Sequence, residues 1–316
     1  MKIVIPGGSG ELGTLLARAF RSEGHEVVVL SRRSLPGPWR VVEWDGVNPG
    51  AWTAEVDGCD VVINLAGRSV NCRYTAANRR EILESRVLST RAVGRAIAAA
   101  TQPPGVWLQA STATIYAHRY DAANDERTGL IGGSEPNAPE TWRFSIDVAT
   151  AWEQAANEFE PARTRKVLMR SAIVMSPRRG GAFNILLRLV RFGLGGREGD
   201  GRQFVSWIHH QDWVRAVEWL ITHPELAGPV NLASPHPLPN DQFMRALRRA
   251  AGVPIGLPAT RWMLEAGALV IRTETELILK SRRVIPTRLI ESGFAFQFPD
   301  WPAAADDLAR SKIPSA

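Results

Sequence analysis

The chain has few cysteines, and this shortage limits both its chemistry and its compartment. Among 316 residues, only Cys59 and Cys72 are cysteines. Two cysteines cannot form a disulfide framework, and their spacing matches no zinc site, so we expect no metal centre. The simplest compartment for such a chain is the reducing cytoplasm.

Long apolar runs are also missing. No stretch has the length needed to span a bilayer, so we expect no membrane partner. The run Met263–Ile271 is apolar for only part of a helix, and we assign it to the core or to a lid. The amino terminus enters a strand pattern at once, which leaves no room for a charged leader and an apolar signal core.

Lysine is scarce as well, occurring only at Lys2, Lys166, Lys280 and Lys312. Nearly all of the 38 basic residues are therefore arginines, and with 32 acidic residues the formal charge is +6. The arginines are spread through expected helices and do not cluster with aromatic residues, so nucleic acid is not an expected partner. An anionic dinucleotide would account for part of the basic excess.

A nucleotide-binding βαβ pattern opens the chain. The apolar run 2–5 leads into the glycine turn 7–13, then an amphipathic helix, then the apolar run 27–30. Closely spaced glycines let the backbone turn sharply and approach a pyrophosphate, whose charge then lies at the free N–H groups of the helix. The helix is supported independently, because Leu12, Leu15, Leu16, Ala19 and Phe20 form one apolar stripe. The alternative is a purely structural glycine turn.

The end of the second expected strand indicates which dinucleotide binds. An NAD site usually has a carboxylate there, and a carboxylate would repel a 2′-phosphate. This chain has Ser31, Arg32 and Arg33 instead. Since a guanidinium can donate two parallel hydrogen bonds to a phosphate, the sequence predicts NADP(H) as the cofactor. The alternative is that the two arginines begin a solvated loop.

Strand and helix patterns alternate through the first half of the chain. Strands are expected over 39–44, 60–67, 106–110 and 166–174, and helices over 76–100, 142–160 and 183–194. This alternation predicts an α/β fold, a Rossmann doubly wound parallel sheet with a smaller, mainly helical carboxy-terminal lobe. We expect residues 1–175 to form the NADP(H)-binding domain, with 205–234 returning to it, and 176–204 and 235–316 to form the substrate-side lobe.

Polar clusters follow the expected strands. They are the glycine turn, Asn64–Gly67, Ser111–Tyr116 and the residues after Val174. In open α/β sheets, ligands bind beyond the carboxyl ends of the strands, so we expect these clusters to line one cleft.

Together these landmarks resemble the extended short-chain dehydrogenase/reductase superfamily, whose members include nucleotide-sugar epimerases. The closer likeness is to an atypical, epimerase-like family with a distinctive carboxy-terminal domain. The motifs that carry it are Asn64-Leu65-Ala66-Gly67, Glu81 with Ser85-Arg86 and Thr90, Gly193-Leu194-Gly195-Gly196, Ser206-Trp207-Ile208-His209, Arg283-Val284-Ile285-Pro286 and Gly293-Phe294. They span essentially the whole chain.

The resemblance implies a set of cofactor-binding residues. Those implied to hold the pyrophosphate are Gly7, Gly10, Glu11, Leu12 and Gly13, and those implied to hold the 2′-phosphate are Ser31, Arg32 and Arg33. Leu65 and Ala66 would line the adenosine side, and Ile173 would approach the nicotinamide. Glu81 and Arg86 would lie near the cofactor, although their spacing alone is typical of a solvated helical ion pair.

The usual catalytic pair of this superfamily, Tyr-x-x-x-Lys, is absent. Tyrosine occurs only at positions 74, 116 and 120, and none of these has a lysine four residues later. Anchored on Glu153, the register places Ser145 at the Tyr position and Ala149 at the Lys position, and a shift of one residue does not restore the pair. Thr112 keeps the usual hydroxyl position, with Tyr116 at the expected offset.

Two functions are therefore open. The first is an NADP(H)-dependent oxidoreductase or epimerase-like enzyme acting on an unidentified small carbonyl or sugar-type substrate. In it Thr112 orients a carbonyl, and Tyr116, Ser145, Asp147 or a water supplies the proton. The second is a catalytically weak NADP(H)-binding sensor or regulatory interaction protein. A homodimer is possible in either case.

A few other residues have alternative roles. Adjacent His209 and His210 on a strand-like run point to opposite faces, so we expect a packing or cleft role for His209 and no shared metal. Asp212 is expected to cap the next helix. Trp207 either fills the core or walls the substrate pocket. Arg202 and Gln203 either bind an anionic substrate or are simply exposed.

Overall fold

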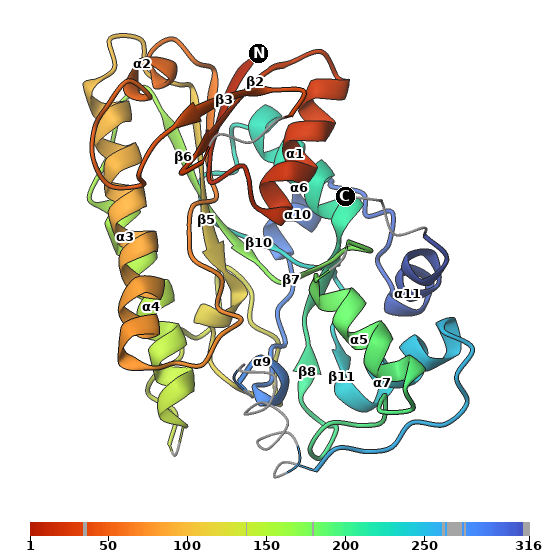
Figure 1. Ribbon diagram of the computed structural model, residues 1–316. Coiled ribbons are helices and arrows are strands. Elements are labelled where there is room, and N and C mark those ends of the chain that lie inside the picture. The colour runs from red at the N-terminus through yellow and green to blue at the C-terminus, as the bar shows by residue number, and fades with distance from the viewer. Residues whose placement is uncertain are drawn as a thin grey trace.

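Seven parallel strands form the central sheet, in the spatial order β10-β6-β5-β4-β1-β2-β3 (Figure 1). They are β1 (Lys2–Pro6), β2 (Glu26–Ser31), β3 (Arg40–Glu43), β4 (Val61–Asn64), β5 (Val106–Thr112), β6 (Arg165–Ser171) and β10 (Gly228–Leu232). The computed structural model describes residues 1–33, 37–136, 138–178, 180–260, 263, 274 and 276–311. The run Met263–Ile271, apart from Met263, lies outside these residues.

Helices cover both faces of the sheet (Figure 1). One face packs against α1 (Glu11–Ser22), α6 (His210–Thr222) and α10 (Thr287–Glu291), and the other against α3 (Ala76–Ala99) and α4 (Glu140–Asn157), with the short α2 (Thr53–Val56) beside α3. Central strands read as continuous apolar runs because both of their faces are buried. The predicted doubly wound Rossmann fold is confirmed.

The expected strand over 166–174 is divided into two strands. After β6 ends, β7 (Ile173–Met175) leaves the central sheet and pairs with β9 (Trp207–His209) in a separate two-stranded sheet. One apolar run can serve two sheets, so its sequence does not reveal the break at Ala172.

The edge strand β10 was not expected from the sequence. It begins at Gly228-Pro229, a pair typical of turns. Proline is nevertheless tolerated in an edge strand, because its missing N–H removes no bond within the sheet there.

The carboxy-terminal lobe is mainly helical and has its own core. It contains α5 (Ala182–Arg191), α7 (Asn240–Ala250), α9 (Glu276–Leu279) and α11 (Trp301–Arg310), with β8 (Phe204–Val205) paired to β11 (Leu238–Pro239). Phe243 stacks on Trp301 with ring centroids 4.0 Å apart. Trp207 contacts Trp301 edge to face and is fully buried, so it fills this core.

Within the described part of the chain, no helix combines the length and the apolar character needed to cross a membrane.

Candidate functional site

The glycine turn after β1 forms a cradle that a side chain would fill. Gly7 has φ +75°, and a Cβ atom on it would lie 2.7 Å from the backbone of Ala66. Gly13, in the first turn of α1, packs so closely that a Cβ would lie 2.4 Å from Gly8. Gly10 precedes α1 in an extended conformation and makes no side-chain cap. The first amides of α1 are therefore left without a side-chain cap, as at helix N-termini that bind anions.

A cavity of about 530 Å³ adjoins this turn. Seven of the cofactor residues predicted from the sequence line it: Gly7, Gly10, Ser31, Arg32, Leu65, Ala66 and Glu81. Arg33 lies outside the lining, although its amide donates to the Ser31 hydroxyl at 3.3 Å. Four parts of the fold therefore meet on one side of the sheet edge that the carboxyl ends of the strands form. They are the end of β2, the glycine turn, the end of β4 and α3.

Three acidic or basic residues of this cavity, Asp45, Arg68 and Glu84, were not predicted from the sequence. Asp45 lines it beside Arg32, and turn amides of Val47 and Asn48 donate to its carboxylate at 2.8 Å. These hydrogen bonds, that of Asn48 above all, lower the pKa of Asp45. Arg68 also lines the cavity. The turn at Asp45 has a recognisable sequence, but nothing in that sequence indicates proximity to the end of β2.

Glu81 and Arg86 do not pair with each other. Glu81 pairs with Arg68, with 2.7 Å between Nη1 and Oε2. Arg86 lies over the ring of Trp152, 5.0 Å from its centroid, and donates to the carbonyl of Ile82. Burial lowers the pKa of Arg86 to about 10. The alternative of a solvated Glu81–Arg86 ion pair is therefore wrong.

The remaining predicted cofactor residues lie farther along the edge. Glu11 begins α1 and accepts a hydrogen bond from Ser176, which follows β7. Leu12 packs against the core beneath α1. Ile173 is half-buried in β7 and packs against the core of the lobe.

Thr112 and Tyr116, the first two catalytic candidates, differ in their surroundings. Thr112 ends β5, and its Oγ1 accepts from the amide of Thr114 at 3.2 Å. Tyr116 is 2% exposed, donates its phenolic proton to Asn231 at 3.0 Å and accepts from Arg170 at 2.9 Å. Burial raises the pKa of this phenol. Its donor and one acceptor position are thus used inside the protein.

Arg170, which binds Tyr116, also forms a buried ion pair with Glu153, and this pair gives Glu153 a structural role. Arg170 donates to both carboxylate oxygens of Glu153, at 2.8 and 2.7 Å, and the Ser111 hydroxyl donates to the same carboxylate. Glu153, the residue from which the sequence position of Ser145 was inferred, therefore binds Arg170 and Ser111 in the interior next to the carboxyl end of β5.

Ser145, the third candidate, contacts a segment that the sequence analysis did not connect with the site. Its hydroxyl donates to the carboxylate of Glu276 in α9. Asp147, two residues on, is exposed on α4. From the same carboxy-terminal segment, Lys280 donates to the carbonyl of Thr114 at 2.8 Å, and Arg282 donates to its hydroxyl at 3.2 Å.

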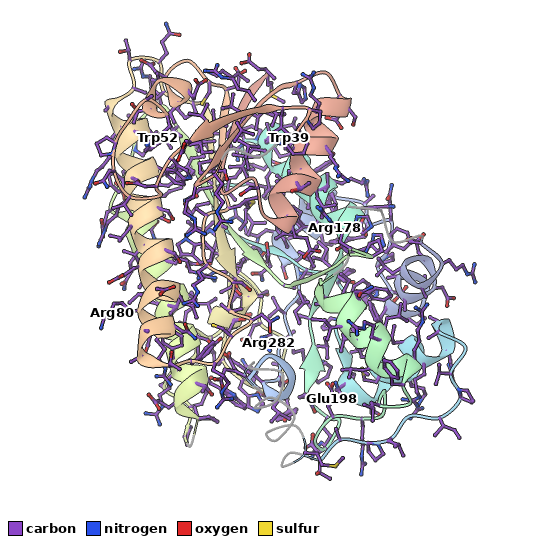
Figure 2. The ribbon with its side chains drawn as sticks, viewed as in Figure 1. Trp39, Trp52, Arg80, Arg178, Glu198 and Arg282 are labelled. Atoms are coloured by element: carbon purple, nitrogen blue, oxygen red, sulfur yellow. The ribbon has the colours of Figure 1, made fainter. Side chains whose placement is uncertain are left out.

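The segment Glu276–Arg282 therefore lies across the carboxyl end of β5. Figure 2 shows Arg282 between the sheet and the lobe, where its amide also donates to the carbonyl of Phe204. The sequence of the segment, in which charged and polar residues surround one apolar triplet at 277–279, gives no signal of this position.

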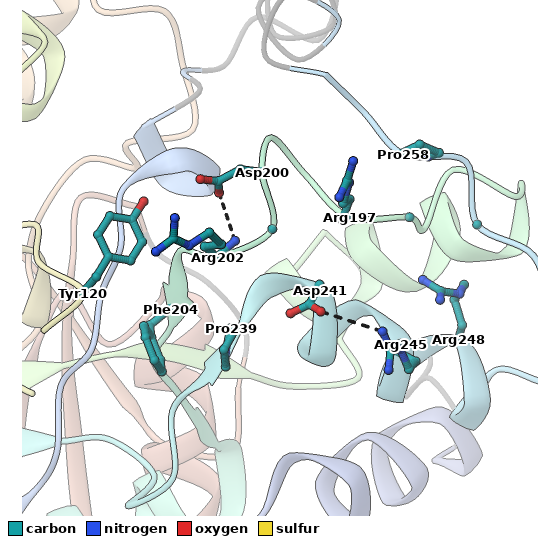
Figure 3. Close-up of a pocket in the computed structure, with 13 residues that line it drawn as sticks. Tyr120, Arg197, Asp200, Arg202, Phe204, Pro239, Asp241, Arg245, Arg248 and Pro258 are labelled. Carbon is teal, nitrogen blue, oxygen red and sulfur yellow. Dashed lines mark hydrogen bonds and ion pairs between the residues drawn. The ribbon is translucent and has the colours of Figure 1, made fainter.

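A second cavity, of about 680 Å³, lies in the carboxy-terminal lobe. Four arginines and two aspartates line it (Figure 3): Arg197, Arg202, Arg245, Arg248, Asp200 and Asp241. The guanidinium of Arg202 lies over the ring of Tyr120, 5.7 Å from its centroid. Gln203, in contrast, is buried and donates to the carbonyl of Glu198. Of the two residues considered for an anionic substrate, only Arg202 faces this cavity.

The His209-His210 pair differs from its expected geometry. The two rings lie side by side, with centroids 4.6 Å apart, because β9 ends at His209 and α6 begins at His210. His209 is fully buried, stacks on Phe298 and caps α6 by accepting from the amide of Gln211. The prediction that Asp212 caps this helix is wrong, since its carboxylate instead accepts from two backbone amides, at residues 297 and 298.

Among the residues that the structure describes, no group of three or more His, Cys, Asp or Glu side chains could hold a metal ion.

Comparison with known families matches nearly the whole chain. Residues 3–233 match the model described as the NAD dependent epimerase/dehydratase family, and residues 259–308 match a domain of unknown function, DUF1731. The second match covers the segment that reaches Thr114 and Ser145.

Named relatives are similar over their full length. The chain is 33% identical over 312 residues to the epimerase family protein SDR39U1 of Bos taurus, covering 98% of this chain and 99% of the relative. It is 30% identical over 313 residues to the epimerase family protein YfhF of Bacillus subtilis, covering 98% of each. A crystal structure of human epimerase family protein SDR39U1 with NADPH is 30% identical, has a TM-score of 0.86, and covers 99% of this chain and 100% of that chain.

Proposed function

Because the chain belongs to the NAD dependent epimerase/dehydratase family, we propose that it is an NADP(H)-binding oxidoreductase or epimerase-like enzyme. Its substrate would be a small carbonyl or sugar-type compound. The observation that carries the proposal is the cradle at Gly7, where no side chain fits and the first amides of α1 have no side-chain cap. A human relative crystallised with NADPH supports the same cofactor here.

The residues around the cradle suit the extra phosphate of NADP(H). Ser31 ends β2 where an NAD site usually has a carboxylate, and Arg32 lines the cavity beside it. Arg33 follows directly in the chain, and its amide donates to the Ser31 hydroxyl. The two guanidinium groups would bind the 2′-phosphate, while Leu65 and Ala66 would contact the adenosine.

The bound cofactor would supply or accept a hydride at its nicotinamide. Thr112 would orient a substrate carbonyl at the end of β5, and Ile173 would pack against the nicotinamide side. Tyr116 and Ser145 are the remaining candidates for handling the proton. Of these two, Ser145 has the hydroxyl directed to other polar groups at the edge, whereas the phenol of Tyr116 is engaged with Asn231 and Arg170.

The cavity in the lobe supports a substrate with an anionic part. Arg197 and Arg202 face it, and neither has a carboxylate partner for its guanidinium among the described residues. A phosphate or carboxylate on the substrate would supply that partner. The division into a cofactor domain (1–175 with 205–234) and a substrate-side lobe (176–204 with 235–316) belongs to this proposal, as do a cytoplasmic location and a possible homodimer.

The deciding experiment follows NADPH absorbance while a panel of aldehydes, ketones, enones and sugar derivatives is added. We expect NADPH to bind and at least one carbonyl class to be reduced. Tight binding without oxidation across the panel would favour the sensor over the enzyme, and failure to bind NADPH would refute both.

Thr112→Val tests the role of the hydroxyl. Loss of the group that orients the carbonyl should lower turnover on the order of 100-fold while NADPH affinity changes little. Unchanged turnover would remove Thr112 from the mechanism.

A further inference from the structure

Three charged side chains from one carboxy-terminal segment are buried at the edge of the sheet. Glu276 and Lys280 are each 1% exposed, and Arg282 is 6% exposed. Burying charge costs stability unless the groups are paired and hydrogen-bonded, and replacing such a cluster with apolar residues often stabilises a protein. A charged cluster that is buried despite this loss of stability is a candidate for a catalytic role.

The cluster lies where the second half of a dinucleotide would extend. The adenosine-side cavity adjoins β1 and β2, and the strand order reverses between β1 and β4. A dinucleotide binds across that reversal, so its nicotinamide half belongs over β4, β5 and β6. Lys280 and Arg282 both bind Thr114, directly after β5.

The side chains form a continuous chain of hydrogen bonds. The hydroxyl of Ser145 donates to Glu276, whose other carboxylate oxygen lies 3.3 Å from Nη2 of Arg282. Arg282 in turn donates to the hydroxyl of Thr114, directly after β5.

We propose that Ser145 is the group that contacts the substrate oxygen and that Glu276 is the proton source acting through it. This inference rests on the proposed oxidoreductase function. Glu276 is a new participant, supplied by a part of the chain 131 positions away from Ser145. The pair would do the work for which the chain has no Tyr-x-x-x-Lys.

The proton transfer balances as follows. A hydride delivered to the carbonyl carbon would form a C–H bond there as a C–H bond of the bound donor breaks, and the π electron pair would become a lone pair on the substrate oxygen. When Glu276 is protonated, its carboxyl donates to Ser145 Oγ, which leaves the Ser145 proton free for the substrate. The Ser145 O–H bond breaks and a new O–H bond forms on that oxygen. Ser145 then takes the proton of the protonated Glu276 carboxyl, which is left as a carboxylate beside Arg282. Solvent returns one proton to Glu276 before the next turnover, and the reverse order applies to oxidation.

The surroundings of Glu276 suit this role. Burial raises the pKa of its carboxyl, and nearby Glu274 raises it further, while Arg282, the Ser145 hydroxyl and Lys280 oppose the shift. A buried carboxyl can thus hold a proton at a pH where an exposed one cannot, and still have cations beside it after the transfer.

A readout that needs no substrate is the ratio of the dissociation constants for NADP⁺ and NADPH, measured by titration calorimetry from pH 5 to 9. The oxidised nicotinamide carries a positive charge that an ionised Glu276 would stabilise. The wild type should bind NADP⁺ progressively better, relative to NADPH, as Glu276 ionises. Glu276→Gln should weaken NADP⁺ relative to NADPH by roughly 5- to 10-fold at the upper end of the range.

Lys280 titrates nearby and must be separated from this effect. Burial, and after it Arg282, lower its pKa to about 8, with Glu276 and Glu135 opposing the shift. His118 faces the same cations, which together with burial lower its own pKa. Lys280→Met should therefore remove the change in the ratio of dissociation constants that occurs as Lys280 loses its proton. The change that accompanies ionisation of Glu276 should remain.

Ser145→Ala provides a second variant in case Glu276→Gln fails to fold. Loss of the hydroxyl donor should shift the Glu276 step to higher pH, and Ser145→Thr should restore it. With any carbonyl that the wild type reduces, Ser145→Ala and Glu276→Gln should each lower turnover at least 100-fold, and Ser145→Thr should recover most of it. Glu198→Gln, which alters another buried carboxyl in the lobe, is the matched control and should leave the ratio unchanged.

The outcomes distinguish this inference from the proposed function. If the wild type and Glu276→Gln share one ratio and one pH profile, Glu276 is not beside the nicotinamide and the inference is overturned, whether or not a substrate is found. If neither cofactor binds the wild type, the proposed function itself fails.

Discussion

The backbone of Gly7 lies directly against that of Ala66, so closely that a Cβ atom on the glycine would be 2.7 Å from the Ala66 Cα atom. The turn after β1 and the end of β4 are therefore held together without side chains between them. The contact helps to shape the cavity of about 530 Å³ beside the glycine turn, because both residues line it.

Gly7→Ala should damage both folding and NADPH binding. Its φ of +75° costs an alanine about 1–2 kcal/mol, and the collision with Ala66 adds to that. Gly24→Ala is the matched control, since Gly24 has φ +82° but nothing within 4 Å of its Cβ position. For Gly24→Ala, urea denaturation should show only the loss of stability that backbone strain causes, and NADPH titration should show unchanged affinity. Equal losses of stability, with NADPH binding intact in both, would contradict the close contact.

Arg32→Asp should weaken NADPH more than NADH. The substitution removes a phosphate ligand and places a carboxylate beside the 2′ position, so we expect at least a tenfold change in the ratio of the two dissociation constants. Arg80→Asp, on the outer side of α3 (Figure 2), makes the same change of charge away from the cavity and should leave the ratio unaltered. An equal loss of both cofactors in Arg32→Asp would refute the 2′-phosphate assignment.

Tyr116→Phe should lower stability and leave NADPH affinity within twofold. The variant removes the donor to Asn231 and an acceptor of Arg170, both in a buried network, at a cost of about 1–3 kcal/mol. Tyr120→Phe, at a residue 39% exposed, should change the free energy of unfolding far less. If Tyr116→Phe were as stable as the wild type but lost turnover, the phenol would be the proton donor after all.

Glu198 should make the protein less stable as the pH rises. Burial raises the pKa of its carboxyl to about 7, with the Asn240 hydrogen bond opposing the shift. Between about pH 4.5 and 7 the folded state holds a proton that the unfolded state has lost, so the free energy of unfolding falls through this window. The contribution is complete below about pH 4.5 and is lost above 7.

Glu198→Gln should remove that pH dependence, in which the free energy of unfolding changes by on the order of 3 kcal/mol at most. Denaturation of the wild type and the variant at pH 5 and pH 8.5 measures the difference. Glu140→Gln, at a residue whose side chain is 80% exposed, should follow the wild type at both values. A parallel pH dependence in Glu198→Gln would show that this carboxyl is ionised in the folded protein throughout.

Local patterns were sufficient to predict the first half of the sheet and the glycine turn after β1. The runs at β1 and β2 are continuous and apolar because those strands are buried on both faces, and glycines stand where the backbone must turn. In contrast, β10 begins with Gly228-Pro229, which reads as a turn unless its place at the sheet edge is known.

Contacts between distant parts of the chain could not be predicted in the same way. His209 rather than Asp212 caps α6, because the carboxylate of Asp212 is occupied by amides some 85 residues later. Likewise nothing in the sequence near Ser145 indicates Glu276. Helical spacing relates neighbours on one helix, whereas this pair depends on how a separate lobe docks.

The hydrogen bond between Ser145 and Glu276 also has a consequence for how the protein is made. A chain synthesised from its amino terminus can pair β1 through β6 while the last hundred or so residues are still being added. Until the segment Glu276–Arg282 emerges, the end of β5 and the start of α4 have no cover. This edge is therefore completed later than the sheet that it covers, and chains released before Glu276 should carry an intact glycine turn with an unfinished edge.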